Sequence, residues 1–119
     1  MSHDHLMKLT THVLDTAHGC PAHNLAVTLT RLSDGAVLKT IRTNADGRAD
    51  APLLEGDQFQ FGVYELSFAA GDYFRARGIT LPEPAFLDLV PIRFGISERR
   101  HYHVPLLVSP YGFSTYRGS

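Results

Sequence analysis

Two imidazoles and a guanidinium are the side chains of this sequence best suited to acid–base chemistry at neutral pH. They belong to His12, Arg48 and His103, which lie in or beside runs of alternating apolar residues. An imidazole can take a proton from water and return it, and a guanidinium can hold a carbonyl oxygen that gains negative charge. Considered singly, such residues are more often structural or solvated, so their function depends on whether the fold brings them together.

A pair of histidines two residues apart raises the question of a metal site. His101 and His103 would share one face of a strand, and His3 and His5 could add ligands. Zinc requires a closed tetrahedral set or three protein ligands with an open position. The sequence has neither a cysteine pair nor the H-E-x-x-H spacing. We therefore expect no metal. We also expect residues 1–7 to form a flexible N-terminal segment.

The loop that carries His18, Cys20 and His23 could hold a second cluster, but an ordinary loop is the simpler interpretation. Cys20 is the single cysteine, so it cannot form an internal disulfide, and it has no evident base partner in the sequence. The sequence contains no G-x-S-x-G nucleophile elbow, no P-loop and no G-x-G-x-x-G pattern after a strand. Established nucleophile and phosphate motifs therefore offer no competing chemistry.

Short alternating runs separated by turns predict an all-β domain that would position these side chains. The expected strands cover Leu9–Leu14, Leu25–Leu32, Val37–Arg42, residues 59–68, Phe86–Ile96 and residues 101–109. Turns are expected at Ser33–Gly35 and Asn44–Gly47, and one short helix at Ala69–Gly78, which a glycine ends. At 119 residues, about seven or eight strands with one short helix predict a single domain with a two-sheet Greek-key sandwich fold.

The last expected strand assigns its histidines to the surface opposite the core. Its residues alternate between a wholly apolar set and a set that contains both imidazoles; the first set is Tyr102, Val104, Leu106 and Val108, and the second is His101, His103, Pro105 and Leu107. Because the apolar set would occupy the core, both histidines should lie on the outer face. Leu107 on that outer face suggests a subunit interface.

Two positions depart from simple alternation. The apolar phase slips by one residue between Val63 and Tyr64, which indicates a β-bulge near Val63 or burial of both faces. Pro105 has no N–H to donate, so the last strand should lie at a sheet edge or be bulged there.

The composition is that of a globular protein without a nucleic-acid or membrane-binding surface. Hydrophobic residues make up 44% and charged residues 19%, and eleven basic residues against twelve acidic ones give a net charge of -1. This balance gives no electrostatic basis for binding nucleic acid or an anionic membrane. No stretch approaches the roughly 18 apolar residues of a membrane span. The polar N-terminus lacks the pattern of a secretory signal, so we expect a cytoplasmic protein.

Short segments of this sequence resemble the transthyretin-like family over essentially the whole chain. They are LTTHVLDTAHGCPA at Leu9–Ala22, TNADGR at Thr43–Arg48 and HYHVPLLVSPYGFSTYRGS at His101–Ser119. Within that family they are similar to the 5-hydroxyisourate hydrolases of purine catabolism rather than to the hormone carriers. The distinguishing feature is the hydrolases' C-terminal Tyr-Arg-Gly-Ser signature, which is complete at residues 116–119.

The resemblance implies an activity, an assembly and a set of site residues. Such hydrolases open the six-membered ring of 5-hydroxyisourate, giving 2-oxo-4-hydroxy-4-carboxy-5-ureidoimidazoline in urate degradation, and use no cofactor. They are homotetramers, dimers of dimers, with active sites in a channel between the dimers. His12, Arg48 and His103 match the catalytic set, and His12 and Arg48 would also bind substrate. Tyr116 matches a substrate-contacting residue, and Ser114 is a further candidate contact.

The division of labour between the two imidazoles is open at this point. We expect His103, alone or with His12, to activate the water. The C-terminal residues 114–119 would be ordered because they fold into the channel. The main alternative is a carrier of a small aromatic ligand with the same fold, which would not require the histidines, Arg48 or the complete tail. A zinc-dependent hydrolase is a third interpretation.

Overall fold

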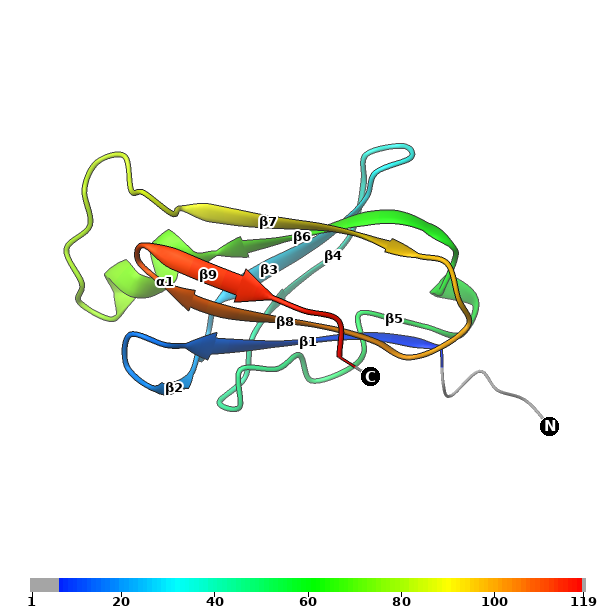
Figure 1. The fold of residues 1–119 in the computed structure, drawn as a ribbon, viewed down its shortest axis with the longest axis horizontal. Coiled ribbons are helices and arrows are strands. Elements are labelled where there is room, and N and C mark those ends of the chain that lie inside the picture. Colours follow the sequence, from blue (N-terminus) through cyan, green and yellow to red (C-terminus); the bar gives the residue numbers. More distant parts are fainter. Residues whose placement is uncertain (1–6, 119) are drawn as a thin grey trace.

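Two β-sheets packed face to face form the molecule (Figure 1). The computed structural model describes residues 7–118. One sheet contains β1 (Lys8–Asp15), β2 (Cys20–Pro21), β5 (Leu54–Glu55), β8 (Tyr102–Ser109) and β9 (Gly112–Thr115). The other contains β3 (Ala26–Arg31), β4 (Ala36–Arg42), β6 (Gly62–Ala69) and β7 (Leu89–Ile96). A short 3-10 turn (Gly56–Gln58) precedes β6, and the helix α1 (Ala70–Ala76) follows it.

The prediction of a two-sheet sandwich with one short helix is confirmed. Within residues 7–118, seven strands have at least four residues and two have only two. The first sheet has the order β2-β1-β8-β9, with β5 also paired to β1, and the second has the order β4-β3-β6-β7. The pair β1–β8 is parallel, whereas every other strand pair in this part of the chain is antiparallel.

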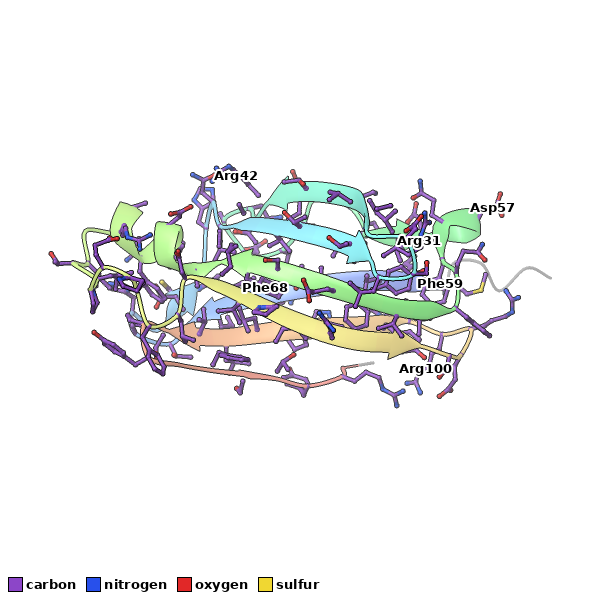
Figure 2. All side chains as sticks on the ribbon, turned by 90° about the horizontal axis from the view of Figure 1, so that it is seen from above. Arg31, Arg42, Asp57, Phe59, Phe68 and Arg100 are labelled. Atoms are coloured by element: carbon purple, nitrogen blue, oxygen red, sulfur yellow. The ribbon has the colours of Figure 1, made fainter. Side chains whose placement is uncertain are left out.

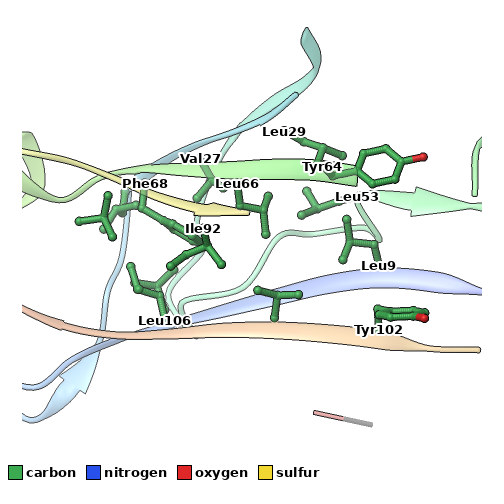
Figure 3. Packing of buried hydrophobic residues seen from close by; sticks show 14 of the residues in the cluster. Leu9, Val27, Leu29, Leu53, Tyr64, Leu66, Phe68, Ile92, Tyr102 and Leu106 are labelled. Atoms are coloured by element: carbon green, nitrogen blue, oxygen red, sulfur yellow. The ribbon is translucent and has the colours of Figure 1, made fainter. Parts of the chain in front are cut away.

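The apolar faces of the two sheets meet in one core between them (Figure 3). Leu9 and Leu106 from the first sheet pack toward Val27, Leu66 and Ile92 from the second. Burying one such side chain stabilises the fold by about 1.5–3 kcal/mol. Charged side chains such as Arg31, Arg42 and Arg100 lie on the outside (Figure 2).

The alternation predicted for the last strand is confirmed. In β8 the side chains of Tyr102, Val104, Leu106 and Val108 are buried, and His103 and Leu107 on the other face are half-buried. Pro105 is the exception on that face, because it is buried as well. The helix is also confirmed, and Gly78 beyond its end has a positive φ of 87°.

The slip between Val63 and Tyr64 has neither of the predicted causes. Phe61 and Val63 are exposed by 54% and 52%, while the side chains of Tyr64 and Phe68 are buried. β6 begins at Gly62 and pairs with β3 and β7 without a register shift. Phe61 and Val63 therefore belong to a surface, whereas Phe59 before them is buried in the core, and β6 itself is not bulged there. A bulge occurs instead between β3 and β4.

Neither alternative predicted for Pro105 is found, because β8 is not an edge strand and its pairs with β1 and with the C-terminal segment keep one register. β8 runs between β1 and β9. The β8–β9 ladder ends at the pair Leu106–Thr115, and the next bridge, His103–Gly118, is isolated. Pro105 lies between these two pairs, where the ladder is interrupted and a missing N–H costs no hydrogen bond.

In residues 7–118, none of the helices is long and apolar enough to cross a membrane. Most of the expected N-terminal flexible segment, including His3 and His5, lies outside the described residues. Met7, its last residue, is buried in the core.

Candidate active site

The parallel pairing of β1 with β8 brings two sets of polar side chains onto one outer face. Thr10 is opposite His103, and His12 is opposite Pro105. In β1, buried and half-buried side chains alternate, so Thr10 and His12 share the face that points away from the core. His101, just before β8, and His103 are half-buried on the same side. Residues separated by about ninety positions in the chain therefore become neighbours.

A threonine hydroxyl joins the two histidines of this face. Thr10 Oγ1 lies 2.7 Å from His101 Nε2 and 2.8 Å from His103 Nδ1, both within hydrogen-bond distance. His103 is thereby held through one ring nitrogen. In the described part of the chain, no hydrogen bond engages its other ring nitrogen, Nε2. This nitrogen is free to act on a bound molecule.

A tight turn positions Arg48 beside the same outer face of β1 and β8. The Asn44 side-chain oxygen accepts hydrogen bonds from the backbone N–H of Asp46 at 2.9 Å and of Arg48 at 3.1 Å. Gly47 has a positive φ of 77°, and its carbonyl accepts a hydrogen bond from Val13 N–H at 2.8 Å. A side chain at Gly47 would collide with the Val13 carbonyl oxygen, so this contact requires glycine.

This docking of the turn against β1 forms an antiparallel bridge between His12 and Arg48. Arg48 itself is exposed. Its charge stands close enough to lower the pKa of both His12 and His103. The turn thus fixes the backbone position of Arg48, and its long exposed side chain can adjust to place the guanidinium against a bound ligand.

A cavity of about 440 Å³ lies at this face. Its lining includes both histidines of the β8 segment, the threonine that joins them, the turn arginine and the carboxylate beyond it: His101, His103, Thr10, Arg48 and Asp50. The volume lies in the range of small-molecule sites in proteins. Polar and charged groups that converge on one concave surface are typical of a site that recognises a polar molecule.

The electrostatics of the site favour the neutral forms of His12 and His103. Burial, then Arg48, then His101 and His12, lower the pKa of His103 below the ordinary 6.5. Burial and Arg48 likewise lower the pKa of His12, and Asp46 partly offsets them. Both groups are therefore mainly unprotonated at neutral pH, the form in which an imidazole accepts a proton.

The C-terminal segment runs back along β8 (Figure 1), and Gly118 forms an isolated antiparallel bridge with His103. Gly118 N–H donates to the His103 carbonyl at 2.7 Å, and His103 N–H donates to the Gly118 carbonyl at 3.4 Å. Arg117 lies 3.8 Å from a Glu98 carboxylate oxygen, and its guanidinium is 5.8 Å from the centre of the Tyr102 ring. The described part of the tail is thus attached to the sheet.

The two remaining predicted site residues lie elsewhere in the chain's own structure. Tyr116 is 61% exposed and lines a second cavity of about 280 Å³ together with Tyr102 and Arg117. Ser114 is exposed in β9, opposite Leu107. The structure brings Arg48 and His103 onto one cavity but does not bring Tyr116 or Ser114 to it.

Sequence reasoning missed Thr10. The alternation of residues in β1 already places Thr10 on the same face as His12. The sequence does not show, however, that Thr10 pairs with His103 on the neighbouring strand. The predicted loop at His18 contains a further unforeseen contact. Asp15 is buried and accepts hydrogen bonds from Tyr73 Oη at 2.8 Å and from the His18 ring at 2.6 Å.

Among residues 7–118, no group of three or more His, Cys, Asp or Glu side chains is placed to hold a metal ion. Cys20, half-buried in β2, is a free thiol. Within the described residues, its sulfur accepts one hydrogen bond, from Arg77 Nη1 at 3.8 Å.

Comparisons with known proteins agree with the resemblance seen in the sequence. The family described as HIUase/Transthyretin matches residues 9–118. The chain is 67% identical over 114 residues to a 5-hydroxyisourate hydrolase of Mesorhizobium japonicum, covering 94% of this chain and 92% of that protein. It is 60% identical over 115 residues to one of Pseudomonas aeruginosa, covering 94% and 91%.

Solved structures are similar as well. A 5-hydroxyisourate hydrolase of Klebsiella pneumoniae has a TM-score of 0.81 and 37% identity, with 94% of this chain and 98% of that chain covered. A crystal structure of (S)-allantoin synthase has a TM-score of 0.90 and 47% identity, and this chain covers 43% of it.

Proposed function

The chain belongs to the HIUase/Transthyretin family, and we infer from this membership that it hydrolyses 5-hydroxyisourate in urate degradation. The observation that carries the inference for this site is that Arg48 and His103 line one cavity. The substrate is a planar, polar, acidic purine derivative, and charged and hydrogen-bonding groups suit it. A carrier of a small aromatic ligand, the alternative, has no need of a guanidinium and a neutral imidazole side by side.

The reaction breaks an amide-type C–N bond of the six-membered ring. It needs an activated water, a group to hold the carbonyl oxygen as it becomes negative, and a proton for the leaving nitrogen. We propose that His103 takes a proton from water through Nε2 while the water oxygen bonds to the carbonyl carbon. The C–N electron pair then leaves with nitrogen, which receives the proton from the imidazolium.

Arg48 is proposed to bind the substrate and to hold the developing oxyanion. Its exposed side chain and permanent charge support this role. His12, bridged to Arg48 through the backbone, is proposed to bind substrate and to assist proton transfer. His103 is the stronger candidate for the base because it lines the cavity, whereas His12 is not among the lining residues.

The tail is proposed to complete the site. Gly118 lies against His103, and Tyr116, two residues earlier, is proposed to contact the substrate, with Ser114 as a further contact. Removing residues 116–119 tests this proposal. We expect hydrolysis to fall strongly, and unchanged hydrolysis would refute a role for the tail.

A homotetramer, a dimer of dimers, is proposed as the working assembly. The supporting feature is a set of large apolar side chains left exposed beside the β9 edge and the start of β7: Phe86, Leu89, Tyr111, Phe113 and Tyr116. Edge strands with exposed apolar residues are usually covered by another chain. Light scattering after gel filtration would test the assembly, with Phe113→Glu as the disrupting variant; a monomeric parent protein would refute it.

The activity is tested by generating 5-hydroxyisourate in situ with urate oxidase and following its ultraviolet absorbance. The protein should accelerate the decay, His103→Asn should abolish most of the acceleration, and His23→Asn, an exposed histidine outside the site, should not. Decay no faster than the spontaneous reaction would end the enzyme interpretation. Activity lost in a chelator and restored by metal would revive the zinc interpretation. The proposed cytoplasmic location is tested by cell fractionation.

A further inference from the structure

Within the described residues, the Thr10 hydroxyl is the one group that lies within hydrogen-bond distance of both His101 and His103. Its oxygen is 2.7 Å from His101 Nε2 and 2.8 Å from His103 Nδ1. Thr10 and His103 form the second residue pair of the parallel β1–β8 ladder, so the backbone pairing of the two strands fixes the position of Thr10. The threonine is also half-buried, which limits competition from water.

The number of protons restricts what this contact can do. A neutral imidazole carries one N–H and one acceptor nitrogen, and a hydroxyl has one proton and two lone pairs. His103 can act as a base through Nε2 only if its own proton is on Nδ1. In that tautomer Nδ1–H must donate to Thr10 Oγ1. The threonine proton is then free to be donated to His101 Nε2.

We propose that Thr10 is a positioning residue that selects the Nδ1–H tautomer of His103, with His101 accepting the threonine proton. This inference rests on the proposed function, because it assigns the supporting contacts of the same base. The chain of donors runs from His103 Nδ1–H to Thr10 Oγ1 and from Thr10 Oγ1–H to His101 Nε2. It leaves the lone pair of His103 Nε2 available at the cavity.

The proton balance of the reaction is unchanged by this arrangement. Water gives its proton to His103 Nε2, and the resulting imidazolium keeps Nδ1–H on Thr10. The hydroxide oxygen forms the new C–O bond, the C–N bond breaks, and Nε2–H is given to the departing nitrogen. Thr10 holds the ring in place throughout and exchanges no proton with the substrate.

Three variants separate this role from a structural one. Thr10→Val keeps the branched shape but cannot accept the Nδ1–H bond, and Thr10→Ser restores the hydroxyl. Thr28→Val is the matched control, because Thr28 is a half-buried threonine in β3, away from the site. We expect Thr10→Val to lower kcat by about tenfold to hundredfold, the worth of one partly buried hydrogen bond, with KM little changed. Thr10→Ser should recover most of kcat, and Thr28→Val should match the parent.

Nitrogen-15 NMR of the imidazoles provides a readout that needs no substrate. In the parent protein, the His103 shifts should report a protonated Nδ1 and a bare Nε2. In Thr10→Val the proton should move largely to Nε2. If the parent shows no hydrolysis, the proposed function fails, but the tautomer experiment still tests Thr10.

Two results would overturn the proposal. One is a Thr10→Val protein with the parent tautomer and parent kcat. The other is a His101→Ala protein that keeps the parent tautomer ratio and the parent kcat. That result would show that His101 does not orient the Thr10 hydroxyl. Should Thr10→Val fail to fold, Thr10→Ser and the parent spectrum decide the matter, since a parent His103 with its proton on Nε2 refutes the tautomer directly.

Discussion

Replacing Gly118 with alanine would place a methyl group against the ring of His103. A Cβ at this position would lie 2.9 Å from His103 Cδ2, 3.2 Å from Cβ and 3.4 Å from Cγ. Real Cβ atoms almost never approach another heavy atom closer than 3.0 Å, so either the ring or the tail must move. The backbone of the tail cannot retreat without stretching its two bonds to His103, at 2.7 and 3.4 Å.

The expected loss is larger for activity than for stability. Losing one or two hydrogen bonds at an exposed chain segment costs about 1–2 kcal/mol of local attachment. The core between the sheets is untouched, so the free energy of global unfolding should change by less than about 0.5 kcal/mol. A base displaced by a fraction of an ångström, in contrast, should lower kcat/KM on the order of tenfold to hundredfold.

The assay combines hydrolysis with hydrogen exchange. Gly118→Ala should slow the decay of 5-hydroxyisourate and speed amide exchange in the tail, while urea unfolding stays unchanged. Gly112→Ala is the matched control in β9, because its nearest contact would be Ser109 Oγ at 3.8 Å, an ordinary separation. A Gly118→Ala protein with the parent kcat/KM and the parent tail protection would refute the reasoning.

Three further changes test the electrostatics of the chain. The acid limb of the kcat/KM profile should lie below pH 6.5, because burial and Arg48 lower the pKa of His103 and a base must be unprotonated; a limb at or above 6.5 would contradict this. Arg48→Gln should lower kcat by about a hundredfold and move that limb to higher pH, whereas Arg48→Lys, which keeps the charge, should leave the limb in place. Asp15→Asn should cost about 1–3 kcal/mol in urea unfolding at neutral pH. Burial alone would raise the pKa of Asp15, but hydrogen bonds, first from Tyr73, hold it below its usual value. Its contribution is therefore complete above about pH 3.9 and is lost as the pH falls through the lowered pKa, so the two proteins should converge in stability there.

Local pattern was enough to predict the strands and the faces of the histidines. In β8 the alternation of four apolar residues with His103 and its neighbours leaves one arrangement that buries the apolar set. The short helix and its glycine were equally local. Alternation is a property of neighbouring residues, so it can be read from one segment without knowing the rest of the fold.

The composition of the cavity was beyond local pattern. Thr10 meets His103 only because β1 pairs with β8 in parallel and in one register, a choice made by the whole sandwich. The prediction of a bulge or of two buried faces near Val63 was wrong for the same reason. Phe61 and Val63 are exposed, and an exposed apolar residue cannot be told from a core residue until its strand partners are known. Pro105 at an interrupted ladder is a third case.

The contact between Thr10 and His103 spans 93 positions of the chain. Pairings of such long range form late, since the loop that they close must first lose its entropy. Turnover of substrate is therefore a test of completed folding. During refolding, catalysis should appear together with the final parallel strand pair, and a chain that has only its local hairpins should be inert.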